Sequence, residues 1–412
     1  MYLTLHDVDV KNKRVLLRVD FNVPLDEQGN ITNDKRIREA LPTIRYLLDK
    51  SAKIIILTHV GRPDEKSTQL STESIALHLG KLLGKPITQV NNCIGNDIEA
   101  AAKAMKLGDI LMLENVRFHD GEKSRDKSKR LEFARQLASL CDIYINDAFA
   151  NSHRDHASMA LVPLFVPGCI GLSAQIELEK ITNAMSKKER PFISIVGGLK
   201  ADKLTSIRNL LSISDHVLLG GALATLFLNA KGYAIGKSRI DTEGVEQCEP
   251  DIIELLKNNK LVLPVDCAVA RTLGKSADII HTAHTAVDHI PEQMMVLDIG
   301  PMTIDLYKKH IASAKTIIWN GPMGAFEIEQ FERGTKEIAY AIARAHATSI
   351  VGGGDSATAV EKYGLQHSMT HVATGGGALL MLLEGKKLPA ITALEESCKR
   401  YRTIASVTAN AV

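Results

Sequence analysis

The stretch IVGGGDSATAV, residues 350–360, joins an apolar run to three glycines and then to the polar start of an expected helix. A strand that passes through a glycine-rich turn into a helix is the unit from which doubly wound α/β folds are built. Glycine lets the backbone approach a ligand closely, and amides at a helix start attract anions. The stretch therefore predicts an α/β fold and a candidate phosphate-binding loop. Glycines that serve only tight strand-to-helix packing are the alternative interpretation.

The same pattern recurs along most of the chain, where apolar runs alternate with amphipathic stretches. The runs lie at 14–19, 53–59, 109–114, 142–147, 191–198, 215–221, 260–266, 315–321, 348–354 and 370–377. Strands that alternate with helices in this way predict parallel sheets covered on both faces. So many strands favour two doubly wound, Rossmann-like sheets over a single open sheet.

A break in this rhythm marks the expected domain boundary. LVPLFVPGCIG, residues 161–171, contains two prolines and two glycines, and a long helical pattern follows it. We expect an N-terminal domain, an interdomain hinge helix, a C-terminal domain and a terminal segment. These span residues 1–170, 171–188, 189–390 and 391–412.

Composition narrows the function. The chain has 412 residues, 45% hydrophobic and 24% charged, with a net charge of +2. This balance does not favour nucleic-acid or membrane partners, and the aromatic residues are too few for a single-strand binder. Six cysteines without a CxxC pair indicate buried thiols in a reducing compartment. Neither a signal peptide nor a membrane-spanning run is evident, so we expect a cytoplasmic protein.

Polar groups at the ends of the predicted strands differ between the two halves. Ligands of open parallel sheets bind beyond the carboxyl ends of the strands. In the first half these positions carry a set of cationic side chains: Arg36, His59, Arg62, Arg117, His153 and Arg154. A guanidinium binds a phosphate or carboxylate through paired hydrogen bonds. Any one of these arginines could simply be a surface residue, but together they predict a site for a small, multiply anionic substrate.

Two other interpretations of HRDH, residues 153–156, fail on spacing. A zinc site would need a third ligand, and no residue has suitable spacing. A protein kinase catalytic loop would need an asparagine five residues after Asp155, where Ala160 stands.

The second half offers glycine-rich strand ends instead. Lys200 and Lys203 follow a glycine pair at an expected helix start, where they would solvate the helix or clamp a phosphate. Asp355 could hold Mg²⁺ through one carboxylate, cap its own helix, or do both. Glu327 could accept hydrogen bonds from a ribose. The P-loop pattern is absent, because GYAIGKS, residues 232–238, is one residue too short.

Taken together, these segments resemble the phosphoglycerate kinase family. The resemblance runs from about residue 14 to about residue 390, and order and spacing agree throughout. It rests on VDFNVP (19–24), DKRIREALPTI (34–44), THVGRP (58–63), LENVRFH (113–119), NDAFANSHRDHAS (146–158), VGGLKADK (196–203), LPVDCAVA (263–270), IWNGPMGAFE (318–327), VGGGDSATA (351–359) and ATGGGALL (373–380).

The resemblance implies a two-domain hinge enzyme. It would transfer a phosphoryl group in line between 1,3-bisphosphoglycerate and ADP, with Mg²⁺, as the domains close, giving 3-phosphoglycerate and ATP. Asp20, Asn22 and the backbone of Phe21 would bind the glycerate end, and Arg36 would bridge to the transferring group. The remote phosphate and the carboxyl end would be held by His59, Arg62, Arg117 and Arg154.

The resemblance also assigns the nucleotide side. Lys200 would follow the moving phosphoryl group as a catalytic residue alongside Arg36. The nucleotide and its metal would be bound by Lys203, Asn320, Glu327, Gly353, Gly354, Asp355 and Ser356, with Asp355 on Mg²⁺. Residues 391–412 would return to the first domain, and the protein would be a monomer.

Four features depart from the family pattern. VGGLKADK is one residue shorter than usual, Asp155 adds a negative charge near the anion site, and Ala373 replaces a serine. The connecting stretch SAQIELEK, residues 173–180, also differs from the usual leucine- and lysine-rich pattern. The resemblance therefore does not fix the rate, the affinity or the hinge coupling. A nicotinamide-dependent oxidoreductase, based on a GxGxxA match in GGGDSA, and a binding module that has lost turnover are the alternative functions.

Overall fold

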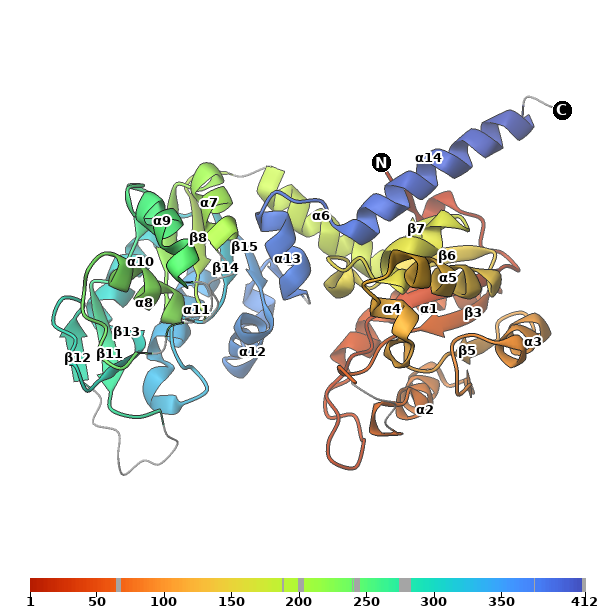
Figure 1. Cartoon of the computed structure of the whole chain (residues 1–412), viewed down its shortest axis with the longest axis horizontal. Coiled ribbons are helices and arrows are strands. Elements are labelled where there is room, and N and C mark those ends of the chain that lie inside the picture. Colours follow the sequence, from red (N-terminus) through yellow and green to blue (C-terminus); the bar gives the residue numbers. More distant parts are fainter. Residues whose placement is uncertain are drawn as a thin grey trace. The chain divides into compact units, whose positions relative to one another are not determined.

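A computed structural model describes residues 1–63, 68–186, 189–198, 204–238, 240, 245–273, 283–373 and 375–409. The chain forms two compact units, the first made of Met1–Glu179 and Lys387–Val412 and the second of Lys180–Lys386. Because the long helix α6 (Leu172–Ser186) crosses this division, the expected separate helix at 171–188 belongs partly to each unit. Figure 1 shows the elements of both units.

The first unit is built on a parallel sheet with the order β1-β7-β6-β2-β3-β5-β4 among the described residues. Its strands are β1 (Leu3–Thr4), β2 (Arg14–Val19), β3 (Lys53–Leu57), β4 (Thr88–Gln89), β5 (Ile110–Met112), β6 (Ile143–Asp147) and β7 (Gly168–Ile170). Its helices are α1 (Lys35–Asp49), α2 (Glu73–Leu83), α3 (Asn96–Ala104), α4 (Asp120–Lys123), α5 (Lys127–Ser139), the start of α6, and α14 (Pro389–Ala409).

The core of this unit explains why the strands read as unbroken apolar runs. Val15 and Leu17 of β2 pack with Ile54 and Ile56 of β3 in a cluster that α1 closes with Ile44. A parallel strand covered by helices on both faces has no solvent-facing side, so its residues do not alternate. The terminal helix α14 packs against β7 and returns the chain end to this unit (Figure 1).

The second unit has a parallel sheet, with the order β10-β9-β8-β14-β15-β16 among the residues that the structure describes. Its strands are β8 (Phe192–Val196), β9 (His216–Leu219), β10 (Leu261–Val262), β14 (Thr316–Asn320), β15 (Thr348–Gly352) and β16 (His371–Val372). Its helices are α7 (Leu204–Ile213), α8 (Gly221–Ala230), α9 (Val245–Leu256), α10 (Pro301–Ser313), α11 (Arg333–Arg344), α12 (Gly354–Lys362) and α13 (Gly376–Leu383). The two doubly wound sheets confirm the predicted fold class.

One feature of this unit differs from the expectation of parallel sheets alone. β11 (Asp266–Ala270) pairs antiparallel with both β12 (Ala283–Ala286) and β13 (Met295–Ile299). The run at 260–266, predicted as one strand, instead ends β10 at Val262, and a new strand begins at Asp266. Figure 1 shows β11, β12 and β13 beside the main sheet.

Candidate active site

Strand register brings three polar segments of the first unit to one edge of its sheet. β2 lies between β3 and β6, with Arg18 opposite both Leu57 and Asn146. The residues that follow these strands are therefore neighbours at the carboxyl edge, although they lie far apart in the sequence. This is the edge at which open α/β sheets bind ligands.

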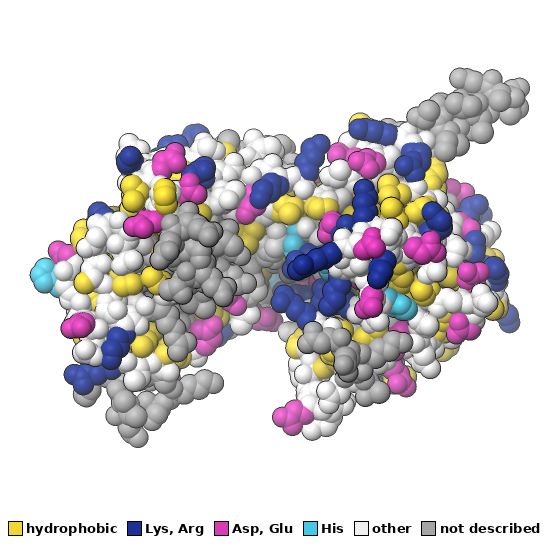
Figure 2. Space-filling model, viewed as in Figure 1, with side chains coloured by type: hydrophobic (Ala, Val, Ile, Leu, Met, Phe, Trp, Pro, Cys, Tyr) yellow, Lys and Arg dark blue, Asp and Glu magenta, His cyan; other side chains and the backbone are white. Residues whose placement is uncertain are grey.

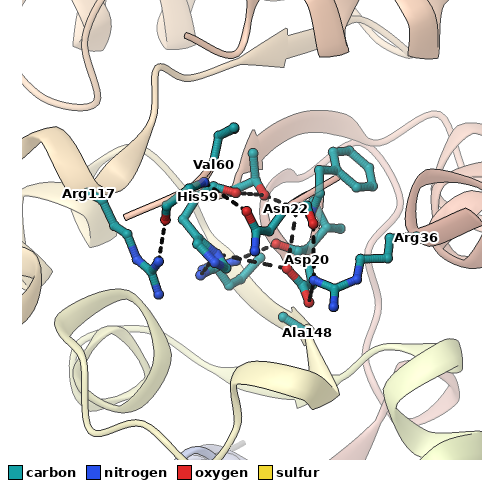
Figure 3. A network of polar contacts seen from close by, with 12 residues as sticks. Asp20, Asn22, Arg36, His59, Val60, Arg117 and Ala148 are labelled. Atoms are coloured by element: carbon teal, nitrogen blue, oxygen red, sulfur yellow. Dashed lines mark hydrogen bonds and ion pairs between the residues drawn. The ribbon is translucent and has the colours of Figure 1, made fainter. Parts of the chain in front are cut away.

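Asp20 is the centre of the first polar network at this edge (Figure 3). Its carboxylate accepts a hydrogen bond from Arg36 Nη1 at 2.9 Å, and the same nitrogen donates to the Asn22 carbonyl oxygen at 3.1 Å. The Asn22 side-chain oxygen accepts from the Gly61 amide at 2.8 Å. The structure thus brings Asp20, Asn22 and Arg36 together, as the sequence predicted for the substrate end.

Phe21 is held firmly within the first unit. Its side chain is fully buried, its amide donates to Thr58 Oγ1 at 2.9 Å, and its carbonyl oxygen accepts from the Val23 amide at 2.8 Å. These bonds fix the shape of the loop. Because a carbonyl oxygen can accept a second hydrogen bond, the contact of the Phe21 backbone with a ligand stays a prediction.

His59 follows β3 and lies 3% exposed beside the same network. Burial, and then the charges of Arg18, Arg117, Arg36 and His156, hold the pKa of His59 well below its usual value. The imidazole is therefore neutral at physiological pH. It can donate a hydrogen bond without adding a charge to the site.

Arg117 lies on the other side of His59 in Figure 3. Its amide donates to Asn115 Oδ1 at 3.1 Å and its guanidinium donates to the Gly61 carbonyl oxygen. Burial first, and then the charges of Arg18, Arg62 and Arg154, lower the pKa of Arg117 to about 10, against the opposing effect of Glu122. An anion bound beside the Arg117 guanidinium would stabilise its charged form.

Arg62 and Arg154 are exposed, and the charge of each helps to lower the pKa of Arg117. His153 is half-buried, and its Nδ1 is enclosed without a hydrogen-bond partner. Burial, and then the charge of Arg154, lower the pKa of His153 to about 4. Figure 2 shows Lys and Arg side chains in dark blue gathered on this unit beside histidine. The cationic side chains predicted from the sequence therefore act on one another, as expected of a site built for a polyanion.

Asp155 departs from the family pattern, but its charge is largely offset. Its carboxylate pairs with Arg130 Nη1 at 2.6 Å, and its side chain is 66% exposed. The added negative charge is therefore held by a neighbouring arginine and screened by solvent.

Arg18 is a member of this network that the sequence analysis missed. It is 1% exposed at the end of β2, and its Nη2 lies 3.3 Å from His59 Nδ1. The signal was available, because RVLLRV places an arginine inside an otherwise apolar strand, where a charge needs a partner.

Glycines line the corresponding edge of the second unit. Asn320 at the end of β14 lies opposite Val196 of β8 and Gly352 of β15, so the turns after these strands are neighbours. A Cβ at Gly197 would lie 2.0 Å from the Pro322 carbonyl oxygen, and one at Gly376 would lie 2.9 Å from Gly353 Cα. Only glycine allows the turns to pack this closely.

Gly353 and Gly354 form the turn that opens α12. Gly353 has a φ of +94°, and a Cβ at Gly354 would meet no atom within 4 Å. The open space at the start of a helix suits an anion bound by backbone amides. Asp355 follows in the first turn and is exposed.

Asn320 and Ser356 lie close to this turn, but their side chains differ in the hydrogen bonds that they already make. Asn320 is 3% exposed, and its Nδ2 is enclosed with no hydrogen-bond partner among the described residues. Ser356 is fully buried, and its hydroxyl accepts from the Gly321 amide at 2.6 Å. Asn320 therefore keeps a free donor, whereas the Ser356 side chain is already used to fix the loop.

Three predicted positions of the second unit remain, and the structure describes one of them. Glu327 is exposed, one residue after Phe326, whose carbonyl oxygen accepts from Lys362 Nζ at 2.9 Å. Lys200 and Lys203 lie outside the described residues.

Metal ligands are sparse in this region. Within the described parts of the chain, three or more His, Cys, Asp or Glu side chains nowhere group closely enough to hold a metal ion. A single exposed carboxylate at Asp355 nevertheless fits Mg²⁺, which takes one or two protein carboxylates and completes its shell with phosphate oxygens and water.

The comparisons with known proteins decide the family. The model of the family described as phosphoglycerate kinase matches residues 5–386. The chain belongs to the phosphoglycerate kinase family. It is 47% identical over 398 residues to the phosphoglycerate kinase of Moorella thermoacetica, covering 96% of this chain and 99% of the relative.

Solved structures of the family show the same fold. The phosphoglycerate kinase of Coxiella burnetii matches with a TM-score of 0.83 at 38% identity, over 96% of this chain and 99% of that one. The one from Pyrococcus horikoshii matches with a TM-score of 0.85 at 33% identity, over 97% and 100%. The chain is accordingly a phosphotransferase of the family whose glycolytic reaction moves a phosphoryl group between 1,3-bisphosphoglycerate and ADP.

Two further observations cover the described parts of the chain. The five cysteines whose side chains are described are buried and free, as predicted. None of the helices in the described ranges is both long and apolar enough to cross a membrane.

Proposed function

We propose that the cationic edge of the first unit binds the anionic 3-phosphoglycerate end, and that the glycine-rich edge of the second unit binds the nucleotide. The observation that carries the proposal is the group of cationic side chains beyond β2, β3 and β5. After burial, the charges of the surrounding arginines lower the pKa values of His59 and Arg117. A phosphate and a carboxylate of one small substrate would supply the missing negative charge.

Arg36 is the residue best placed to serve the transferring group. It sits on the first turn of α1, and Asp20 and the Asn22 carbonyl oxygen fix its guanidinium. A guanidinium held in advance stabilises charge without reorganising during the reaction. Asp20 and Asn22 would also accept and donate hydrogen bonds at the glycerate hydroxyl, while His59, Arg62, Arg117 and Arg154 would hold the remote phosphate and carboxylate.

In the second unit, the open turn at Gly353 and Gly354 would take nucleotide phosphate on its backbone amides. The unpaired Nδ2 of Asn320 supports a role close to the same phosphates. Exposed Glu327 would meet the ribose, and the buried hydroxyl of Ser356 restricts that residue to its backbone amide. Lys200 and Lys203 are proposed from the family motif alone.

Mg²⁺ is proposed to be held by Asp355. When bound with nucleotide phosphates, the ion would offset negative charge on their oxygens. ATP and ADP are proposed as the nucleotides.

No protein group need become covalently modified, because phosphoryl transfer needs alignment and charge neutralisation above all. We propose direct in-line transfer, with closure of the two units excluding water so that the acyl phosphate is not hydrolysed. Arg36 and Lys200 would then neutralise charge on the moving group.

A coupled assay with ATP, Mg²⁺ and 3-phosphoglycerate tests this assignment on Arg36→Ala, with Arg38→Ala as the matched control. Arg38 lies on the same helix, is exposed, and pairs with Asp34 at 2.9 Å outside the network. We expect kcat to fall by at least about 100-fold for Arg36→Ala and to change less than about twofold for Arg38→Ala. Unchanged turnover in Arg36→Ala would refute the assignment. Binding of both substrates by the wild-type chain without product would instead support the binding-module alternative.

A further inference from the structure

Arg18 is a buried cation with an unusual set of partners. Its Nε donates to Ser158 Oγ at 3.1 Å, its Nη1 donates to the Val19 carbonyl oxygen, and its Nη2 lies 3.3 Å from His59 Nδ1. With 1% of the residue exposed, water cannot replace these partners. The guanidinium is therefore fixed in place, and one of its donors is directed at a histidine ring.

The charge of Arg18 is balanced through a relay. Ser158 Oγ donates to Glu122 Oε1 at 2.7 Å, and the Ser158 amide donates to Glu122 Oε2 at 2.9 Å. Glu122 is fully buried, so its carboxylate needs these donors and a nearby cation. The chain Arg18–Ser158–Glu122 therefore accounts for the charge of Arg18 beneath the site, separately from the Asp20 carboxylate that pairs with Arg36.

The chemistry of this contact decides the protonation of His59. A guanidinium has only donors, so the ring nitrogen beside it must act as an acceptor. Nδ1 therefore carries no proton, and in the neutral ring the proton is on Nε2. Asp20 Oδ1 lies 3.9 Å from the same Nδ1, beyond hydrogen-bond distance, so it does not compete for a proton there.

The opposite nitrogen of His59 is available to a ligand. Hydrogen bonds to Nε2 are absent among the described residues, and Nε2 is not one of their enclosed polar atoms without a partner. It therefore keeps access to the space at the carboxyl edge of the sheet.

We propose that Arg18 is a positioning residue that holds His59 as the tautomer protonated at Nε2, so that His59 presents a neutral N–H donor to an acceptor-only oxygen of the substrate. The identity of that substrate as 3-phosphoglycerate rests on the proposed function. The tautomer does not, because it follows from contacts within the first unit.

The groups around His59 agree with a neutral ring. Burial acts against the imidazolium first, followed by Arg18 of β2, Arg117 after β5, Arg36 of α1 and His156 after β6. Of the nearby acids, Asp20 already pairs with Arg36, and Glu122 accepts from Ser158 and lies 3.6 Å from His156 Nδ1. A neutral donor adds selectivity for an anionic oxygen without adding another repelling charge.

Nuclear magnetic resonance of the full chain with ¹⁵N-labelled histidine reads the tautomer directly. Long-range proton–nitrogen spectra recorded from about pH 5.5 to about pH 8 span the usual histidine titration. The His59 signals are assigned by their loss in His59→Gln. We expect an unprotonated Nδ1 and a protonated Nε2 across this range, in the free protein and with 3-phosphoglycerate. A proton on Nδ1, or an imidazolium near neutral pH, would overturn the proposal.

Variants separate positioning from a structural role. Arg18→Met should let both tautomers appear and should raise the pKa of His59. Ser158→Ala keeps Arg18 but breaks its relay, so it should show a smaller change of the same kind even if Arg18→Met does not fold. Tautomer signals identical to wild type in a folded Arg18→Met protein would contradict the proposal.

Two substitutions of His59 compare its nitrogens as donors. Glutamine places its amide near the position of Nε2, whereas asparagine places it near Nδ1. By calorimetry with 3-phosphoglycerate, we expect His59→Gln to bind roughly tenfold more tightly than His59→Asn, the effect of about one hydrogen bond to a charged group. Equal or weaker binding by His59→Gln would count against an Nε2 donor. Absence of phosphoryl transfer in the wild type would refute the proposed function and leave the tautomer result standing.

Discussion

Replacing Arg117 by methionine should stabilise the protein while weakening its binding of anions. Burial first, and then the charges of Arg18, Arg62 and Arg154, lower the pKa of Arg117 from 12.5 to about 10. An arginine with a lowered folded-state pKa is charged in both states at neutral pH, and its charge then favours the unfolded state. Removing the charge should relieve this penalty below about pH 10, and the relief should fade as the pH rises through that value.

The size of the effect follows from the shift. A change of about 2.5 pKa units corresponds to about 3.4 kcal/mol. Because the side chain is only partly buried, we discount this to about 2 kcal/mol for solvent screening. Loss of the hydrogen bond to the Gly61 carbonyl oxygen should cost about 1 kcal/mol. The net gain expected for Arg117→Met is about 1 kcal/mol, or about 2–4 °C in Tm for a unit of this size.

Urea and thermal unfolding in low-anion buffer, repeated with added 3-phosphoglycerate, measure both effects. The matched control is Arg14→Met, because Arg14 pairs with Asp142 at 2.7 Å and this hydrogen bond raises its pKa. That variant should lose up to about 1 kcal/mol and keep the full stabilisation by the ligand. The reasoning is wrong if Arg117→Met is less stable than wild type by more than about 1 kcal/mol, or if the ligand stabilises it as much as wild type.

Three further substitutions test other features. A Cβ at Gly354 would meet no atom within 4 Å, so Gly354→Ala should change the free energy of unfolding by less than about 1 kcal/mol. Because the methyl group would enter the space proposed for the anion, calorimetry should show ADP binding at least about tenfold weaker. Unchanged ADP affinity would mean that the phosphate binds elsewhere. Burial raises the pKa of Asp147, beneath the start of α6, to about 6, so the stability from this group is present below about pH 4 and is lost as pH rises through about 6. The free energy of unfolding of Asp147→Asn, relative to wild type, should therefore rise by up to about 3 kcal/mol between these pH values. Parallel stability–pH profiles of the two proteins would contradict this. Asp155→Ser removes a pair with Arg130 whose acid is 66% exposed, so unfolding should change by less than about 1 kcal/mol and the KM for 3-phosphoglycerate by less than about threefold; a larger fall in KM would mean that Asp155 opposes the substrate directly.

The fold could be predicted largely from strand patterns. β2, β3, β6, β8, β14 and β15 are buried along most of their length, so continuous apolar runs marked them clearly. The antiparallel strand β11 was missed because VDCAVA continues the apolar character of LVLP before it. Its partner β12 has the sequence AHTA and is mostly exposed, so it gave no strand signal.

The site could be predicted as a set of residue types, but not as a network. Arginines and histidines after strand ends indicated an anion site, and strand register then placed them together. The contact of Arg18 with Ser158 joins residues 140 positions apart, which no local pattern reports. The paired backbone of Phe21 and the buried hydroxyl of Ser356 likewise depend on packing against distant loops.

The most direct test of the anion site is a crystal structure of the protein grown with 3-phosphoglycerate. We predict that the ligand lies beyond the carboxyl ends of β2, β3 and β5. Its phosphate and carboxylate oxygens should be within hydrogen-bond distance of Arg36, Arg117 and His59 Nε2. Ligand density bound elsewhere, with these three side chains contacting only water, would contradict the account.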